Sequence, residues 1–476
     1  MDKKLLIIGV AIVVIVVIAA VVFIGLGGKS DDGSQRVDGR LWILGNADGD
    51  LDIDNDDVKY IEERVKDKSL IRGDDKKWCD ANYDSVIDQK DVDFVKTLIK
   101  GKSDVIYYQN YNGMDSNNNL ISQVIKFRVP DADKPVYLML EARCLAEEVL
   151  VVINKNPDHY KVVAASKQCF DYDGQLQFSK QTNPKVMQTT NSNITLDEIT
   201  ILEETYTDGS LILCMGADNY YNKGIEEKIA GYGNTQVVRL PSWERGLTLT
   251  GLMTFGYLFG SQGDIKGKTS WDMAQDYAKW NIKYTTIITE AVKDLKDSDK
   301  KTMANMVITE TNGTYVYKIQ TSSSDPYNYS VEAGAKNFGD KFGSAQSGGN
   351  NVEISKSDLA IMYDVDAIVL QTSGEAFDKI NGPKRSTDCL NLGVSALDGW
   401  ISPDADIYAM SFAFFNGAPY VISMILYAQF LYDDIPAISK LDYKEIYKEY
   451  LDLIGWGDRD LSYLVIYSGP GHTKTA

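Results

Sequence analysis

The fold is decided by one stretch, Ser270-Trp-Asp-Met-Ala-Gln-Asp-Tyr-Ala-Lys-Trp-Asn-Ile-Lys-Tyr-Thr-Thr-Ile-Ile-Thr-Glu-Ala-Val-Lys-Asp-Leu-Lys-Asp297. It contains no glycine or proline, and its large apolar side chains recur at helical spacing along one stripe. The members of this stripe are Met273, Tyr277, Trp280, Tyr284, Ile287, Ile288 and Val292. A helix over 270–297 would be about 40 Å long. The sequence therefore predicts one long helix that connects two separate structural units.

Apolar segments of strand length lie on both sides of this helix and alternate with helical patterns. Before the helix they are 136–140, 148–153, 162–165, 211–215 and 235–240, and after it they are 306–309, 315–319, 367–370 and 405–410. Such alternation is typical of α/β domains with largely parallel sheets. We therefore expect an α/β fold over 105–476, with a first lobe over 105–267, the connecting helix over 270–297 and a second lobe over 303–476.

Two short acidic stretches near the N-terminus repeat each other with the spacing of a calcium-binding loop. They read Asn46-Ala-Asp48-Gly-Asp50-Leu-Asp52-Ile-Asp54-Asn-Asp-Asp57 and Asp80-Ala-Asn82-Tyr-Asp84-Ser-Val86-Ile-Asp88-Gln-Lys-Asp91. Each stretch places oxygen-bearing side chains at loop positions 1, 3, 5, 9 and 12, and the residue at position 7 offers its backbone carbonyl. Ca²⁺ takes about six to eight oxygen ligands, and a loop of this spacing wraps them around the ion in that order. The sequence therefore predicts two Ca²⁺ sites.

One short amphipathic helix is expected after each acidic stretch. A loop followed by a single helix, repeated once, resembles a dockerin, a small all-α calcium module that would cover 39–103. An acidic solvated linker is the alternative, but a linker has no reason to repeat isoleucine at position 8 and aspartate at position 12. The glycine that such loops prefer at position 6 is replaced by Leu51 and Ser85. The resemblance implies a cohesin-like partner, recognised through loop positions 10 and 11, which differ between the two repeats.

The order of segments in the α/β part carries a second resemblance. Asn193-Ile-Thr-Leu-Asp-Glu198-Ile-Thr-Ile-Leu opens a series that continues through 209–215, 236–241, 331–337, 355–362, 366–370 and 417–432. With the long helix, this series is similar to the helix-hinged class of ABC-transporter solute-binding proteins (class III periplasmic-binding-protein-like). The resemblance implies two lobes around a cleft that captures a small-molecule metal chelate (a ferric siderophore, haem or a corrinoid) and an ABC permease as partner. Fused to a dockerin-like module, the combination is archaeal-like.

Three loops at predicted strand ends could line such a cleft. Their candidate residues are Ser242, Trp243, Arg245, Asp325, Tyr327, Tyr329, Trp400 and Ser402. Arg245 could pair with a carboxylate of the solute, and Trp243 could stack on a flat ring. Ordinary packing and helix capping remain the alternative for all three loops. Glu198 is a candidate for one of the acids with which this class docks to its permease.

The N-terminus carries a run of apolar residues. Residues 5–27 are uncharged and follow Lys3 and Lys4. About 20 apolar residues suffice to cross a bilayer as one helix, and the two lysines favour a cytoplasmic N-terminus. We therefore expect a single-pass anchor in the cell membrane, a linker over 28–38 and the bulk of the chain outside the cell.

Composition excludes several classes of function. The chain has 476 residues and a formal net charge of −19, so nucleic acid is not an expected partner. Its two histidines exclude a multi-histidine metal site, and its five cysteines form no Cys-x-x-Cys pair. Neither Gly-x-Ser-x-Gly nor His-Glu-x-x-His occurs, and we expect no enzyme. Two alternatives stay open: a cell-surface scaffold or adhesion protein and, less favoured, a polysaccharide-active enzyme.

Overall fold

The structure is a computed structural model in which described and undescribed segments alternate. It describes residues 40–114, 120–141, 143–167, 169, 186–189, 193–216, 222–241, 246–322, 324–342, 351–372, 382–411, 414–415, 417–455, 461–462 and 464–468. The predicted anchor over 5–27, the linker over 28–38 and the candidate residues Ser242, Trp243 and Arg245 lie outside these residues.

The described helices bear on the predicted membrane localisation. None of them is both long and apolar enough to cross a membrane. This finding contradicts the prediction of a single-pass membrane protein, whose expected anchor lies outside the described residues. The longest described helix, α10 (Ser270–Val292), is amphipathic and exposes charged residues such as Lys279 and Glu290.

The first lobe is built on a parallel sheet. Its strands are β3 (Val136–Leu140), β4 (Tyr160–Ala165), β5 (Met187–Gln188), β6 (Ser210–Met215) and β7 (Thr235–Arg239). They lie in the order β5-β4-β3-β6-β7, and every described pairing among them is parallel. The helices of this lobe are α5 (Arg143–Ile153), α7 (Leu196–Thr205), α8 (Ile225–Lys228) and α9 (Thr248–Gly260). The prediction of a parallel α/β lobe is confirmed here.

One predicted strand of this lobe is wrong. Residues 148–153 form the second half of α5, although their β-branched run favours a strand. Val149, Val152 and Ile153 are buried in the same core as residues of α9 and α10. Helical spacing brings these side chains to one face, and packing on neighbouring helices overrides the local preference.

The second lobe is built on a mixed sheet. Its strands are β8 (Thr302–Thr311), β9 (Thr314–Gln320), β10 (Lys336–Asn337), β11 (Asn351–Ile354), β12 (Ala367–Thr372), β13 (Asp406–Ser411) and β14 (Val465–Ser468). The order is β11-β9-β8-β12-β13-β14, with β10 beside β8. Central strands β8, β12 and β13 are parallel, whereas β9 and β14 run antiparallel to their neighbours. The helices are α11 (Asp325–Glu332), η2 (Phe338–Phe342), η3 (Asp358–Met362), α12 (Gly382–Leu397), α13 (Tyr420–Tyr432), α14 (Pro436–Ser439) and α15 (Tyr443–Ile454).

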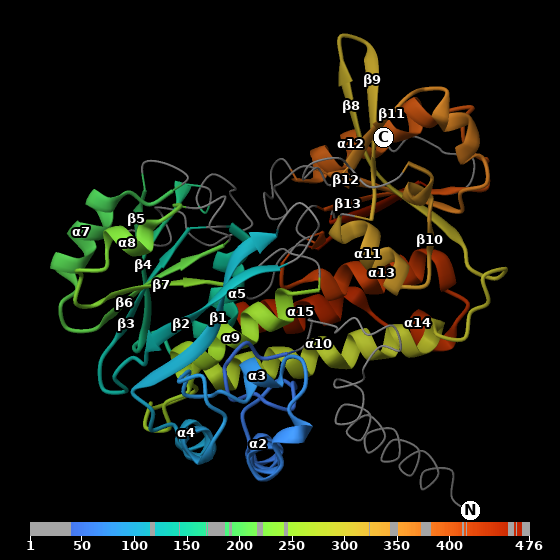
Figure 1. Cartoon of the computed structure of the whole chain (residues 1–476). Coiled ribbons are helices and arrows are strands. Elements are labelled where there is room, and N and C mark those ends of the chain that lie inside the picture. Colours follow the sequence, from blue (N-terminus) through green and yellow to red (C-terminus); the bar gives the residue numbers. More distant parts are fainter. Residues whose placement is uncertain are drawn as a thin grey trace, which may run out of the picture.

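The long helix α10 runs beneath both lobes, from one to the other (Figure 1). A capping box formed by Thr269 and Asp272 starts it. It ends at Val292, earlier than the predicted 297, because Asp294 and Asp297 would place negative charge at the negative end of the helix. Its buried stripe packs on α5 and α9 in one half and on α13, α14 and α15 in the other.

A small N-terminal unit lies against the first lobe (Figure 1). It comprises α2 (Asn55–Lys66), η1 (Lys68–Leu70), α3 (Asp75–Trp78) and α4 (Gln89–Ile99), followed by the antiparallel ribbon β1 (Val105–Met114) and β2 (Leu120–Arg128). The Trp42 backbone N–H donates to Thr254 Oγ1 of α9 at 3.2 Å, and Ile43 forms a β-bridge with Tyr108 of β1. The unit and the first lobe therefore share one hydrophobic core.

Candidate functional site

The first-lobe sheet reverses its order of winding between β3 and β6. The chain adds β4 and β5 on one side of β3 and then crosses back to add β6 and β7 on the other side. At such a switch point the loops at the carboxyl ends of the strands diverge, and α/β proteins bind ligands in the crevice that results. Glu141 follows β3 directly at this point, and its backbone N–H donates to the Cys214 carbonyl of β6 at 3.1 Å.

The Glu141 side chain is fully buried, and its two oxygens differ. Oε1 accepts hydrogen bonds from the Ile194 backbone N–H at 2.8 Å and from Asn222 Nδ2 at 2.5 Å. Oε2 is buried and has no hydrogen-bond partner among the residues that the structure describes. Burial raises the pKa of Glu141 to about 8, a shift that the Arg239 charge opposes and the Glu226 charge reinforces. The switch point therefore holds a carboxyl group with one unsatisfied oxygen.

Arg239, at the end of β7, is buried beside this group. Its Nε lies 2.5 Å from Glu226 Oε1, and its Nη1 donates to the Gly216 carbonyl at 3.2 Å. Its Nη2 donates to the Asn222 carbonyl at 3.0 Å. A guanidinium offers several donors in a fixed fork, and here they connect Gly216, directly after β6, with Asn222 and Glu226.

An aromatic floor lies where α5, α10 and α15 meet. The ring centroids of Trp280 and Tyr450 lie 5.5 Å apart. Within the described part of the chain, the buried Tyr450 hydroxyl and Trp280 Nε1 have no hydrogen-bond partner. Burial raises the pKa of Tyr450 well above its usual range, and the charges of Glu147 and Glu148 add to this. The ring centroids of Tyr447 and Phe414 lie 4.9 Å apart, and Phe414 comes shortly after β13 in the chain. The floor therefore connects α10 and α15 with the segment that follows β13.

The predicted cleft residues of the second lobe fall at separate places. The interpretation of 322–329 as a loop is wrong from Asp325 onward, because Asp325, Tyr327 and Tyr329 lie on α11, which the Ser324 side chain caps. Tyr329 is buried and stacks on Tyr420 at 4.8 Å. Tyr327 donates to Asp340.

Trp400 and Ser402 precede β13, at the amino end of a strand that runs parallel to β12. The structure therefore does not gather these two residues at the carboxyl edge. Glu198 serves as a capping group of α7, where its Oε2 accepts from the Thr195 N–H at 2.8 Å.

Glu141, Asn222 and Arg239 are the site residues that the sequence analysis missed. One signal was present, because an acid follows the apolar strand 136–140 at once. What makes it informative is the pairing of β3 with β6, whose residues lie far away along the chain.

The two acidic loops fold alike. In each, the carboxylate at position 12 is buried and accepts from the backbone N–H of position 3 (Asp48 at 3.2 Å, Asn82 at 3.2 Å). The same carboxylate also accepts from the N–H of position 9 (Asp54 at 2.9 Å, Asp88 at 2.8 Å). Both loops are thereby closed between their middle and their end.

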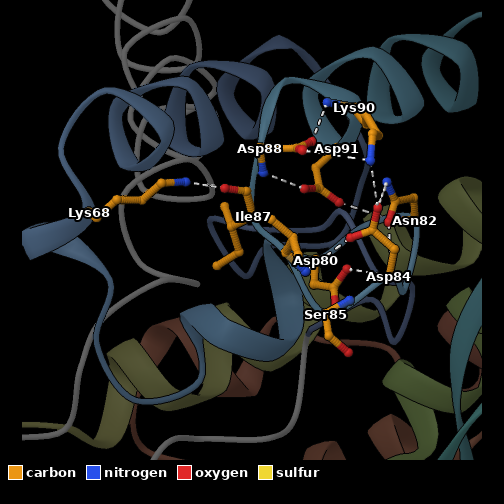
Figure 2. A network of polar contacts seen from close by, with 10 residues as sticks. Lys68, Asp80, Asn82, Asp84, Ser85, Ile87, Asp88, Lys90 and Asp91 are labelled. Carbon is orange, nitrogen blue, oxygen red and sulfur yellow. Dashed lines mark hydrogen bonds and ion pairs between the residues drawn. The ribbon is translucent and has the colours of Figure 1, made fainter.

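Further side chains in these loops accept from N–H groups two residues ahead. The donors are Asp50, Asp52 and Asp56 in the first loop and Asp84, Val86 and Lys90 in the second. Figure 2 shows the second loop, where Lys90 Nζ reaches Asp84 Oδ2 at 3.3 Å. Ser85 adopts φ +72°, so position 6 of this loop takes the turn for which glycine is usual.

Negative charge accumulates in the loops. Burial and neighbouring acids raise the pKa of Asp50 to about 7 and that of Asp52 to about 6. Burial and the nearby Asp80 charge raise the pKa of Asp91 to about 6. Burial and the Asp48 charge also raise the pKa of Asp57. Carboxylates in such a group repel one another, and a bound cation would offset that repulsion.

The loops offer the donor type, and the order of donors along the chain, that calcium prefers. Oxygens at positions 1, 3, 5, 7, 9 and 12 belong to two loops that close in the same way. In the described residues, no three His, Cys, Asp or Glu side chains gather tightly enough to hold a metal as they stand. Their carboxylates are turned onto backbone N–H groups and would have to rotate toward an ion.

Comparison with known proteins relates the chain to one fold. No family model matches it, and no curated protein is similar to it in sequence. A TroA-like periplasmic binding protein, FepB from Veillonella parvula, is 11% identical with a TM-score of 0.52, over 72% of this chain and 95% of that one. This match shows the fold: the chain has the α/β fold of a TroA-like periplasmic binding protein.

Two further solved structures are more distant. An ABC transporter solute-binding protein from Sulfurospirillum deleyianum is 12% identical with a TM-score of 0.44, over 72% of this chain and 94% of that one. The periplasmic haem-binding protein HutB of Vibrio cholerae is 14% identical with a TM-score of 0.41, over 61% and 96%.

Proposed function

We propose that this chain is the non-enzymatic solute-binding protein of an ABC importer and that its cargo is a ferric siderophore, haem or a corrinoid. The observation that carries the proposal is the pair of α/β lobes joined by α10, in the fold of a TroA-like periplasmic binding protein. The crevice beside Glu141 and the aromatic floor would line the solute site. An ABC permease would receive the cargo.

Capture would involve little movement between the lobes. The α10 helix packs on both lobes, and one hydrophobic core continues from α9 through α10 to α13 and α15. The Asn154 side chain, just after α5, donates to the Leu453 carbonyl of α15 at 3.3 Å. Packed interiors resist continuous deformation, so the loops around the crevice would adjust more than the lobes.

Two Ca²⁺ ions form the second part of the proposal. The first would be held by Asn46, Asp48, Asp50, Asp54 and Asp57 with the Asp52 carbonyl, and the second by Asp80, Asn82, Asp84, Asp88 and Asp91 with the Val86 carbonyl. Calcium would neutralise the grouped carboxylates and order both loops. The module so ordered would bind a cohesin-like domain in a calcium-dependent manner, and binding that persists in a chelator would contradict this.

Thermal unfolding of residues 40–476 tests the solute proposal. The protein would be heated with calcium and with a panel of ferric siderophores, haem and corrinoids. A solute that binds only the folded state raises the midpoint, by an amount equivalent to about 2.7 kcal/mol at a hundred times its dissociation constant. A saturable shift with one class would support uptake and identify the cargo. No shift with any member would favour the scaffold or adhesion function instead.

A further inference from the structure

We propose that Glu141 Oε2 is a recognition atom for a positively charged hydrogen-bond donor on the solute, so that the site prefers a cationic chelate. This inference rests on the proposed solute-binding function and adds to it the charge of the cargo. Neither the fold nor the comparisons assign this role to Glu141 Oε2.

Glu141 lies at the end of β3, beside β6, where the first-lobe sheet reverses its order of winding. The carboxyl edge of a parallel sheet at such a point is where α/β proteins place a ligand. A side chain at this switch point is therefore better placed to contact a solute than a side chain elsewhere on the sheet.

The two side-chain oxygens of Glu141 differ in their hydrogen bonding. Oε1 accepts from the Ile194 N–H at 2.8 Å and from Asn222 Nδ2 at 2.5 Å. Oε2 is buried and has no partner among the described residues. Buried polar atoms are almost always hydrogen-bonded, and an exception needs an explanation. A glutamine would hold the same two donors through its single oxygen, so holding the loops does not explain why the residue is an acid.

The charged side chains around Glu141 favour a cationic solute group over an anionic one. Arg239 is buried in the same hydrogen-bond network, and its contacts to Glu226, Gly216 and Asn222 already engage it. Glu226 adds negative charge near Glu141, as its effect on the Glu141 pKa shows. An anionic solute group would add to the negative charge of Glu226 here, whereas an ammonium group would favour the ionised form of Glu141, complete the hydrogen bonding of Oε2 and balance its charge.

The test uses two probes that differ in one charge. The first is a linear trihydroxamate ferric chelate with a free terminal ammonium group, and the second is the same chelate with that amine acetylated. Affinities for residues 40–476 would be measured by tryptophan fluorescence at constant ionic strength. We expect the wild-type protein to bind the ammonium form about tenfold or more tightly than the acetylated form, as for one hydrogen bond to a charged group.

Two variants complete the design. Glu141→Gln keeps the Oε1 contacts and removes the ionisable group, so we expect it to abolish the preference by weakening the binding of the ammonium form, and an unchanged unfolding temperature shows that the variant is folded. Glu227→Gln, an exposed acid on α8, removes the same charge away from the crevice and should keep the preference.

The other outcomes are also decisive. Equal binding of both forms by the wild-type protein would overturn the inference and leave the solute-binding function standing. A preference that survives in Glu141→Gln would overturn it as well. Binding of neither form would overturn it too, and the haem and corrinoid arms of the unfolding panel would then decide separately whether the solute-binding function stands.

Discussion

Asp57 and Asp91 occupy the last position of the two acidic loops, and both are buried. Each accepts two or more backbone hydrogen bonds that close its loop. An asparagine keeps the shape but offers one oxygen and no charge. We expect Asp57→Asn and Asp91→Asn each to remove one of two calcium equivalents in a calorimetric titration. The exposed Asp93→Asn on α4 is the matched control and should retain both. Two full equivalents in either loop variant would contradict the assignment.

The pKa values of the loop acids predict how calcium acts at different pH. Asp50, Asp52 and Asp91 have an ordinary pKa of 3.8, raised to about 7, 6 and 6 in the fold. A raised pKa means that these acids stabilise the metal-free fold below about pH 4, and that this stabilisation is lost as the pH rises through 6 to 7. Calcium requires Asp50 and Asp91 to be deprotonated, because these two would bind it through their carboxylates.

We therefore expect the rise in unfolding temperature caused by calcium to be larger at about pH 7.5 than at about pH 5. Thermal scans with calcium and with a chelator at both pH values give the two differences. Each difference compares calcium with chelator at one pH. The effect of titrating groups outside the loops is therefore the same in both scans and cancels. An equal shift at both values would mean that the raised acids are not the calcium ligands.

The loop residues could be predicted from sequence because their chemistry is local. Positions 1 to 12 of one loop are neighbours along the chain, so spacing alone indicates a shared site. Glu141 could not be found in this way, because Cys214, Asn222 and Arg239 join it only after β3 has paired with β6. A site assembled from distant strand ends requires the strand order, which periodicity does not give.

Among the elements, α5 and α11 show where local patterns fail. The β-branched run in 148–153 favours a strand, but its spacing also suits a helix face, and packing against α10 decides between the two. In α11, Pro326 lies in the first turn, where a helix tolerates proline. The sequence pattern instead predicts a loop for Asp325, Tyr327 and Tyr329.

The contact between α9 and α10 depends on a glycine. A Cβ at Gly256 would lie 2.3 Å from Ala274 Cβ and 2.9 Å from the Ser270 carbonyl oxygen, both on α10. In an open helix, glycine to alanine would stabilise by about 1 kcal/mol. Here overpacking costs about 1–3 kcal/mol, and we expect a net loss.

The expectation for Gly256→Ala is therefore a lower midpoint of urea unfolding with calcium present. Gly231→Ala provides the control, because a Cβ at that position would meet nothing within 4 Å and the backbone needs no left-handed conformation. The control should leave the midpoint nearly unchanged. A rise in the midpoint of Gly256→Ala would show that the two helices are not packed as described.

In the whole molecule, two lobes could be predicted and the docking of the N-terminal unit could not. The long apolar stripe of α10 indicated a helix shared between two units. Nothing in the acidic repeats indicated that Trp42 would be buried and its N–H bonded to Thr254, or that Arg40 would stack on Trp78 at 4.1 Å. These contacts depend on side-chain shape at a surface that forms only after folding.

A shared core has a consequence for unfolding. Because the N-terminal unit and the first lobe bury one continuous set of apolar side chains, we expect them to unfold in a single transition. Removing calcium should then move that whole transition to lower temperature instead of splitting it. Calorimetry together with far-UV circular dichroism of residues 40–476, with calcium and with a chelator, measures this.

Thr254→Val extends the test to the junction itself. Valine keeps the shape of threonine but leaves the buried Trp42 N–H without its acceptor, which costs about 1–3 kcal/mol. If the unit and the lobe are one cooperative structure, this single change should lower the transition of the whole protein. An early separate transition in the variant or in chelator, with the main transition unmoved, would instead show that the calcium module folds independently. Coupled unfolding would mean that calcium bound at the acidic loops stabilises the same structure that holds the solute crevice.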